Sequence, residues 1–359
     1  MPIRTVIVGA SHRAKVYGLD LIRLGDLFEL VGIADIDADR ALEMAQILDL
    51  DNGCVYTDDE AMFSDLQPEL VIIGTPPSAH CENIEKALTF KPKRILSIPP
   101  FAMTAAQAGG LYKLIEQDGR TKFSEAHPFF FSQWWANLER ELRLPLSGVC
   151  SGYMSSFSRQ TEDELPSDEV NTYHSVPKVG GVQWKFLPAL ITCANRLTGD
   201  LPLAVHARGE RGKRDTFVRM SGTIEYVHGH IFHFDVAKMF GMDHLILNSP
   251  DAHFNIVHPD WLIFRDVPTL ILQGKHDRQV QTSYGMPTDV RLQLLRSLGE
   301  CFEEDCMRIP SLCESCVSMY CLDAIIASAL DLREVEVEIP ESICDAYEKQ
   351  MNVLRRSTP

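Results

Sequence analysis

Apolar runs and amphipathic segments alternate along the first 125 residues. The apolar runs have the length of buried strands and lie at residues 4–10, 28–35, 68–75, 93–98 and 121–126. The segments between them repeat apolar positions at helical spacing, over residues 11–23, 37–48, 80–88 and 104–117. Continuous apolar strands separated by helices are typical of a parallel sheet covered on both faces. The pattern predicts a doubly wound α/β domain over residues 1–125, with ligands bound beyond the carboxyl ends of the strands.

Residues 126–359 follow a second pattern. After a predicted helix near residues 129–143, strand-like runs recur at residues 148–157, 203–210, 216–227, 228–237, 243–249, 252–258 and 261–266. Further helices are predicted over residues 181–199, 290–306, 315–330 and 343–356. This succession predicts an α+β domain with an open, mostly antiparallel sheet. The acidic stretch 159–175 is either a mobile loop at a cleft or an ordinary solvated loop.

The composition adds a strong acidic balance. Apolar residues make up 45% of the chain, and 34 basic against 50 acidic side chains give a formal charge of −16. A field of this sign repels phosphate backbones and anionic lipids, so we expect neither a nucleic-acid nor a membrane partner. The amino terminus lacks the pattern of a signal peptide, and no apolar run approaches the roughly 20 residues of a spanning helix. We therefore expect a cytoplasmic protein.

The ten cysteines are expected to be reduced thiols, because no targeting segment is evident. Five of them lie between residues 301 and 321, and Cys313 and Cys316 form a CxxC pair. This pair is either part of a zinc site or of a buried helix. The surrounding segment has helical apolar periodicity, and cysteine packs as a small apolar residue. Without a second CxxC we favour the helix and predict no metal site.

The first strand runs into the sequence GASHRA, which indicates a nucleotide site. It matches the pattern G-x-G-x-x-G at Gly9, and small residues, Ser11 among them, stand in the other two glycine positions. Small residues there let a pyrophosphate approach the backbone N–H groups at a helix amino terminus. His12 and Arg13 complete this turn.

Asp35 ends the second predicted strand and adds to the nucleotide pattern. A carboxylate at this position accepts ribose hydroxyls and repels a 2′-phosphate, so NAD(H) would be favoured over NADP(H). The alternative is that Asp35, with Asp37, only caps the helix that follows.

These segments resemble the glucose-fructose oxidoreductase / inositol dehydrogenase / MocA family of NAD(P)-dependent oxidoreductases. The resemblance rests on VIVGASHRAKVYG, ELVGIADIDADRA, VYTDDEAMF, PELVIIGTPPSAH and KRILSIPPFAMT, and extends to LCESCVSMYCLDAIIASALDLREVEV. It implies a Rossmann domain followed by an open sheet that carries the substrate side of a cleft and often an oligomer interface. The most specific motif, TPPSAH, would place Thr75, Pro76 and His80 over the cofactor.

The resemblance also identifies a missing group. Family members carry Glu-Lys-Pro at the end of the fifth strand, and the continuation FAMT aligns Ile98, Pro99 and Pro100 with these residues. The family's lysine binds the substrate oxygen and helps to move its proton, which needs a titratable group. Pro99 has none and would only line the substrate site. Pro100 is retained, and a cis peptide bond before it would suit a tight turn.

A second family motif also lacks its acid–base residues in this sequence. Its glycine pair aligns with residues 180–181, and the positions of its aspartate and histidine then hold Lys185 and Ala189. Thr192 stands where another aspartate is common. Helical spacing predicts that these three residues face one cleft. The neighbouring Trp184 would add an aromatic surface for the substrate.

Four side chains are candidates for the missing acid–base work. Lys185 is the obvious cation, since a lysine in an apolar cleft can have an altered pKa, but it could equally extend to solvent. His127 follows the last strand of the first domain, as a catalytic group or as a structural donor. Tyr173 and His174 precede the glycine pair, where the family places polar groups on the substrate side.

Three functions remain open. The first is an enzyme of small-molecule or secondary metabolism that has lost hydride transfer and promotes a rearrangement, cyclisation or elimination of an apolar substrate. Holding a reactive conformer accelerates such chemistry without a strong base. The second is an NAD-dependent oxidoreductase acting on an alcohol, ketone or sugar-like substrate with non-standard groups. The third is a non-catalytic binding protein. NAD would accordingly be used, vestigial or absent, and the family's habit predicts a homo-oligomer.

Overall fold

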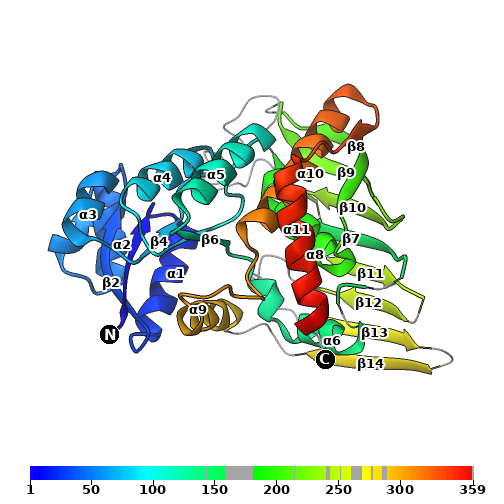
Figure 1. Ribbon diagram of the computed structural model, residues 1–359, viewed down its shortest axis with the longest axis horizontal. Coiled ribbons are helices and arrows are strands. Elements are labelled where there is room, and N and C mark those ends of the chain that lie inside the picture. The colour runs from blue at the N-terminus through cyan, green and yellow to red at the C-terminus, as the bar shows by residue number, and fades with distance from the viewer. Residues whose placement is uncertain are drawn as a thin grey trace. The chain divides into compact units, whose positions relative to one another are not determined.

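The chain forms two compact units (Figure 1). One consists of Met1–His127 and Asp289–Ser315, the other of Pro128–Thr288 and Cys316–Pro359. The chain thus returns to the first unit at residues 289–315. The sequence predicted a division near residue 125, with C-terminal helices that pack back on the first domain. The computed structural model describes residues 1–142, 144–146, 148–157, 181–213, 215–239, 243–250, 252–259, 269–275, 278–284 and 289–357.

The first unit contains a six-stranded parallel sheet. Its strand order is β3 (Val55–Tyr56), β2 (Phe28–Ala34), β1 (Ile3–Val8), β4 (Leu70–Ile73), β5 (Arg94–Ser97) and β6 (Lys122–Glu125). Every residue of β4 and β5 is buried, as expected for strands covered on both faces. The predicted doubly wound domain is confirmed. The strand β3 was not predicted, since two half-buried residues leave no apolar pattern.

Helices cover both faces of this sheet. Figure 1 shows α3 (Asp59–Leu66), α4 (Pro77–Thr89) and α5 (Ala105–Asp118) along one face, and α1 (His12–Arg23) and α9 (Val290–Glu300) along the other. In the sequence, β2 is followed by α2 (Ala38–Ile47) and the 3₁₀ turn η1 (Asn52–Cys54), which lead to β3. Both α2 and α3 begin after an aspartate whose carboxylate accepts from N–H groups of the first turn, which stabilises the helix start.

The strand order creates a switch point between β1 and β4. From β1 the chain crosses to β2 on one side, whereas β4, β5 and β6 follow one another on the other side. In sheets of this kind, ligands bind in the crevice at that point, outside the carboxyl ends of the strands. The candidate site is therefore sought at this edge of the first unit.

The second unit contains a nine-stranded sheet. Its order is β14 (Arg278–Tyr284), β13 (Thr269–Lys275), β12 (His253–Val257), β11 (His244–Asn248), β7 (Ser151–Phe157), β10 (Ile231–Ala237), β9 (Phe217–Tyr226), β8 (Pro202–Arg211) and β15 (Val335–Glu336). Neighbouring strands are antiparallel, except that β10 and β7 are parallel. The predicted mostly antiparallel sheet is confirmed. The strands β13 and β14 were not predicted, and both the predicted strand 261–266 and the acidic stretch 159–175 lie outside the described residues.

Helices lie on one face of this second sheet in Figure 1. They are α6 (Gln133–Leu142), which follows the 3₁₀ turn η2 (Pro128–Phe131), α8 (Val182–Thr198), α10 (Leu312–Asp331) and α11 (Glu341–Ser357). Along β10, Phe232 and Phe234 are buried while His233 between them is exposed. This alternation is typical of a sheet with one packed face and one solvated face.

The helix α10 corrects the expectation about long apolar runs. Within its 20 residues, an 18-residue stretch has a mean hydropathy of 1.4, so by length and composition it could cross a membrane. However, 83% of this stretch is buried inside the structure. A helix that is apolar all round and surrounded by protein is a core helix.

One pair of cysteines contradicts the expectation that all ten are reduced. Cys301 and Cys306 form a disulfide, with their Cα atoms 5.9 Å apart. The chain turns between them and brings the two side chains within bonding reach. Cys313 and Cys316, in contrast, are buried thiols of α10. Among the described residues, no group of three or more His, Cys, Asp or Glu side chains could hold a metal ion.

The loop closed by the disulfide also holds a buried arginine. Arg94 begins β5 and is 1% exposed. Its guanidinium donates to the carbonyl oxygens of Cys301, Phe302 and Glu304 and to the hydroxyl of Ser124. Residues 301–304 therefore supply acceptors for a charge buried at the amino end of β5.

Candidate functional site at the carboxyl edge of the parallel sheet

The turn between β1 and α1 forms the first part of the candidate site. Gly9 has a φ of +95°, and a Cβ atom there would lie 2.6 Å from the amide nitrogen of Thr75. Glycine is needed for both the backbone conformation and the close approach to β4. The Ser11 hydroxyl caps α1 by accepting from the Ala14 N–H, and it donates to the Gly74 carbonyl at 2.7 Å. The exposed His12 is the first residue of α1.

Asp35 fixes the same turn from the β2 side. Its carboxylate accepts from the backbone N–H groups of Ala10, at 2.6 Å, and Asp37, at 2.9 Å. Asp37 in turn caps α2 through the N–H groups of Asp39 and Arg40. Helix capping thus applies to Asp37, whereas Asp35 is half-buried beside the turn. A carboxylate has about four acceptor positions, so two bonds leave capacity for ribose hydroxyls.

His80 ties the end of β4 to the loop after β5. The ring is 1% exposed, and its nitrogens face two carbonyl oxygens, Nδ1 that of Pro100 at 2.8 Å and Nε2 that of Thr75 at 2.5 Å. Carbonyl oxygens only accept hydrogen bonds, so both ring nitrogens can donate at the same time only when the ring is a protonated imidazolium. Burial opposes this charge and lowers the pKa of His80, although both backbone contacts favour the charged form. His80 therefore holds two loops together, and Pro76 stands just before α4.

The loop after β5 contains the position of the missing lysine. The Pro99–Pro100 peptide bond is cis, as the tight turn suggested. The Phe101 N–H donates to the carboxylate of Glu125 at 3.0 Å, and Thr104 caps α5. The backbone of this loop is held at both ends, while the ring of Pro99 offers no group that titrates.

Arg13 brings a cation to this loop. From the first turn of α1, its Nη1 donates to the Pro99 carbonyl oxygen at 3.3 Å. Because β4 lies between β1 and β5 in the sheet, the Arg13 side chain extends across the carboxyl end of β4. The guanidinium is a planar cation with several N–H donors.

Glu125 and His127 form a carboxylate–imidazole pair at the end of β6. The Nε2 atom of His127 lies 3.2 Å from Oε2 of Glu125, and both residues are buried. A carboxylate in this position accepts a hydrogen bond from the ring and orients it. The same carboxylate also holds the loop after β5 through Phe101. Sequence reasoning missed Glu125, although its place at the end of a parallel strand was a usable signal.

The other candidate residues lie in the second unit or outside the described residues. Lys185 is half-buried in the first turn of α8, with its ammonium 5.8 Å from the centre of the Phe186 ring. Trp184 is 2% exposed. Tyr173 and His174 lie outside the part of the chain that the structure describes.

Ala189 and Thr192 are packed inside the second unit, where a cleft-facing position was expected. Thr192 is 1% exposed, and its hydroxyl donates to the Pro188 carbonyl at 2.7 Å and lies 3.0 Å from the Ser318 hydroxyl of α10. Ala189 is 4% exposed. Helical spacing predicts which residues share one side of α8. Because α8 is covered on more than one side, the spacing does not tell which side is open.

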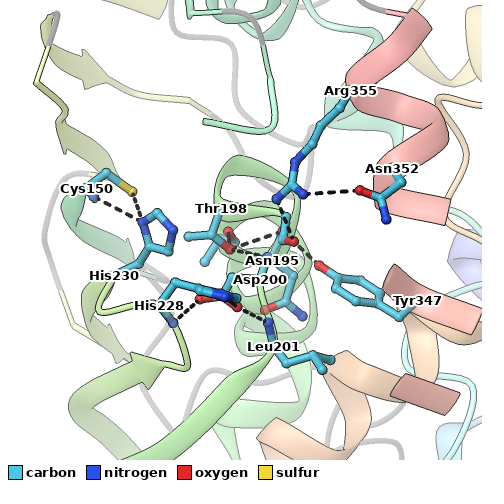
Figure 2. A network of polar contacts seen from close by, with 12 residues as sticks. Cys150, Asn195, Thr198, Asp200, Leu201, His228, His230, Tyr347, Asn352 and Arg355 are labelled. Atoms are coloured by element: carbon cyan, nitrogen blue, oxygen red, sulfur yellow. Dashed lines mark hydrogen bonds and ion pairs between the residues drawn. The ribbon is translucent and has the colours of Figure 1, made fainter. Parts of the chain in front are cut away.

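Figure 2 shows a polar network around the carboxyl end of α8. The carboxylate of Asp200 accepts from the backbone N–H of His228 and contacts its ring Nδ1, each at 2.7 Å. Asn195 accepts two hydrogen bonds from tyrosine hydroxyls, each at 2.9 Å. The Tyr226 hydroxyl donates to its side-chain oxygen, and the Tyr347 hydroxyl donates to its backbone carbonyl oxygen. These contacts join α8 to β9, α11 and the turn before β10, which is a structural role.

Cys150 and His230 extend this network (Figure 2). The Nδ1 atom of His230 accepts the Cys150 N–H at 3.0 Å and lies 3.2 Å from the thiol sulfur. Burial raises the pKa of the Cys150 thiol to about 12 and lowers the pKa of His230. Both groups are therefore neutral near pH 7, and a buried neutral thiol is a poor nucleophile. The pair joins the starts of β7 and β10.

The residues at the strand edge fit a dinucleotide. The first turn of α1, a helix of 12 residues, carries the positive end of the helix dipole, which would favour a pyrophosphate. Asp35 offers acceptors for ribose hydroxyls, and its charge opposes a 2′-phosphate. This combination fits NAD better than NADP.

Comparison with known proteins supports a nucleotide-binding Rossmann domain. Residues 3–127 match the profile of the oxidoreductase family with an NAD-binding Rossmann fold, glucose-fructose oxidoreductase / inositol dehydrogenase / MocA. An uncharacterised oxidoreductase of Schizosaccharomyces pombe is 30% identical over 116 residues, which cover 32% of this chain and 31% of that protein. The match thus spans about a third of this curated relative.

Solved structures share the fold over nearly the whole chain. The aldose-aldose oxidoreductase from Caulobacter crescentus, complexed with glycerol, has a TM-score of 0.78 at 15% identity and covers 94% of this chain and 100% of its own. The WlbA dehydrogenase from Bordetella pertussis, solved with NADH and UDP-GlcNAcA, has a TM-score of 0.71 at 13% identity, with 95% and 100% covered. The predicted resemblance is confirmed: residues 3–127 match this family's model, and the chain shares the fold of these solved structures.

Proposed function

We propose that the protein is an NAD-binding enzyme of small-molecule metabolism that promotes a non-redox rearrangement, cyclisation or elimination of an apolar substrate. The main support is the loop after β5. Its backbone is held by Glu125 and His80, yet Pro99 stands at the position of the family's proton-handling lysine. The scaffold is retained without the acid–base group that oxidation of an alcohol needs.

In this proposal each residue of the strand edge binds or orients. Asp35 and the first turn of α1 would hold the nucleotide, whose nicotinamide supplies hydride transfer in enzymes of this kind. Pro99 would line the substrate site with an apolar ring. A substrate held in a reactive conformation, with donors placed where charge develops, reacts faster without a strong base.

Calorimetric titration and product analysis test this proposal. We expect NADH to bind wild-type protein, and Asp35→Asn to weaken NADH binding by about tenfold because the charged acceptor is lost. We expect no oxidation of NADH with a panel of ketones, and a product of unchanged mass from an unsaturated or polycyclic substrate. Steady NADH oxidation by the wild type over that panel would overturn the proposal.

The loop itself allows a gain-of-function test. Pro99→Lys restores a titratable group while Pro100 and the FAMT segment stay in place, so we expect NADH oxidation with ketones to appear. Met103→Lys, a half-buried position of the same loop, is the matched control and should stay inactive. Activity in both variants would show that any added lysine suffices.

A second candidate function is NAD-dependent oxidation or reduction of an alcohol, ketone or sugar-like molecule. The Glu125–His127 pair favours it, because a carboxylate that orients an imidazole is a common acid–base arrangement. His127→Gln should then slow turnover by roughly 100-fold or more with NADH affinity unchanged. Lys185→Ala and His174→Ala test the other predicted groups, and each should slow turnover by more than about tenfold. Tyr173, a homo-oligomer and a cytoplasmic location stay predictions from the sequence.

A further inference from the structure

The disulfide of the first unit differs in state from every other cysteine of the chain. Cys301 and Cys306 are joined, whereas the other eight cysteines are free thiols. A chain with many free thiols suits a reducing compartment, where a disulfide is usually transient, catalytic or redox-sensing. Cys301 is half-buried and Cys306 is 8% exposed, so the Cys301 side is the more accessible to an attacking thiol. The pair therefore meets the access that thiol–disulfide exchange requires.

Acceptors for the reduced thiols lie beside the pair. The Sγ atom of Cys301 lies 2.7 Å from the carbonyl oxygen of Ser297, and Sγ of Cys306 lies 3.6 Å from the same oxygen. The Cys301 carbonyl oxygen is also 3.6 Å from Sγ of Cys306. A thiol is a weak hydrogen-bond donor, so each reduced cysteine finds an acceptor in place. The same surroundings thus suit the oxidised and the reduced pair.

The segment after the disulfide covers the open edge of the first sheet. The strand β6 is the last strand on its side, so its outer N–H groups have no further strand to pair with. The Glu125 N–H donates to the Pro310 carbonyl oxygen at 3.0 Å, and an antiparallel bridge joins Ser311 to β6. The Ile309 N–H donates to the Cys306 carbonyl oxygen at 3.0 Å. A single turn therefore connects the disulfide to the residues that cover β6.

Glu125 connects this edge to the candidate site. Its carboxylate accepts from the Phe101 N–H in the loop after β5 and lies 3.2 Å from Nε2 of His127, while its backbone N–H donates to Pro310. Arg94 holds the disulfide loop in place through three of the loop's carbonyl oxygens. The position of the Glu125 carboxylate therefore depends on the segment that the disulfide closes.

We infer that Cys301 and Cys306 form a reversible redox site, whose state controls how firmly the loop after β5 is held. The reductant is a dithiol. Its thiolate attacks Sγ of Cys301, the S–S bond breaks, and Cys306 leaves as a thiolate that takes up a proton. The second thiol of the reductant then releases Cys301, so that the dithiol becomes a disulfide and gives two electrons to the pair. Reduction removes the covalent closure, and the segment over β6 opens more often.

A redox titration combined with hydrogen exchange tests this inference. The full-length protein is equilibrated in buffers of reduced and oxidised dithiothreitol, and its free thiols are alkylated and identified by mass spectrometry. Cys301 and Cys306 should change state together and reversibly, with an unchanged circular dichroism spectrum. In the reduced protein, amide exchange in peptides that contain Glu125 or Phe101 should become faster by about tenfold or more. Exchange in the central strand β4 should not change.

Serine variants separate this pair from the other thiols. The double variant Cys301→Ser/Cys306→Ser should show the exchange rates of the reduced wild type and no response to dithiothreitol. Cys54→Ser removes a half-buried free thiol of the same unit and should keep the full response of the wild type. If the double variant does not fold, the comparison of oxidised with reduced wild type decides the question.

Three results would overturn the inference. A pair that stays oxidised in excess dithiothreitol until urea unfolds the chain would be a fixed structural bond. A pair that stays reduced in fully oxidised dithiothreitol would not be a redox site. Equal exchange at Glu125 and Phe101 in both states would separate the disulfide from the candidate site. Every measurement is made without NADH, so a failure of the proposed function leaves these results unaffected.

Discussion

The two polar networks of the molecule, one in each unit, use similar side chains in different ways. At the strand edge, His80, Glu125 and Arg13 bond to the backbone of loops that follow parallel strands. At the end of α8, Asn195 accepts the hydroxyl of Tyr347 inside the core (Figure 2). It also accepts the hydroxyl of the buried Tyr226. The first arrangement shapes loops at a place where ligands bind, and the second joins helices to a sheet. Buried polar residues therefore indicate a site when they hold loops at a ligand-binding edge.

The largest effect is expected at the first turn of the strand edge. Gly9→Ala puts a Cβ 2.6 Å from the Thr75 amide nitrogen at a φ of +95°. We expect NADH binding to weaken on the order of 100-fold and the free energy of unfolding to fall by about 2–3 kcal/mol. Urea unfolding and calorimetric titration measure the two effects.

Gly110→Ala is the matched control for this change. Gly110 lies within α5, and a Cβ there meets nothing within 4 Å. Alanine should stabilise the helix by about 0.5–1 kcal/mol and leave NADH affinity unchanged. If Gly9→Ala binds NADH as well as Gly110→Ala does, the first turn is not the nucleotide site.

In the second network, a substitution should lower stability without changing NADH affinity. Asn195→Ala removes the acceptor of the Tyr226 hydroxyl and one contact of the Ser318 hydroxyl, which keeps its contact with Thr192. We expect a loss of about 2–3 kcal/mol in unfolding free energy. NADH affinity should not change. The exposed Asn352→Ala should change stability by less than about 0.5 kcal/mol. A weaker NADH affinity in Asn195→Ala would show that the two networks do not act independently.

The smallest expected effect is a dependence of the unfolding free energy on pH, to which both networks contribute. Burial is the main cause that lowers the pKa of His80 in one network and of His230 in the other below the ordinary value of 6.5. The unfolded chain therefore binds more protons as the pH falls. The stability that the neutral rings contribute is present above pH 6.5 and is lost as the pH falls through the folded pKa values.

Urea titrations between pH 7 and pH 5 would measure this loss. His230→Asn keeps an acceptor for the Cys150 N–H without titrating, so its stability should fall less steeply with pH than that of the wild type. His80→Asn makes the same comparison at the strand edge. Parallel curves for wild type and both variants would assign the pH dependence to other groups.

Hydrophobic periodicity predicted most of the first sheet and the class of the second. It did so because β1, β2, β4 and β5 are apolar runs bounded by helices with clear starts. The strand β14, with the sequence RQVQTSY, was missed because a polar edge strand has little apolar alternation. The disulfide was missed because it depends on how the chain turns between Cys301 and Cys306 rather than on composition.

The candidate site was predictable only where spacing along the chain carries the signal. Gly9 and Asp35 follow a motif, and the structure brings both to one turn. The contact between Glu125 and Phe101 depends on β5 and β6 being neighbours, which no local pattern specifies. Thr192 was expected on an open face because spacing identifies the side of a helix but not what covers that side.

The buried Arg94 has a consequence for the order in which the chain matures. Its acceptors, the carbonyls around Phe302, leave the ribosome about two hundred residues after β5 does. Until then, a growing chain cannot bury this guanidinium without an unpaired charge, which is costly. The environment of this side chain is thus completed late in synthesis, after the strands of the second unit have emerged. A fragment ending at residue 127 would lack these acceptors, so we expect the Arg94 guanidinium to stay exposed in it and the fragment to be prone to capture by chaperones.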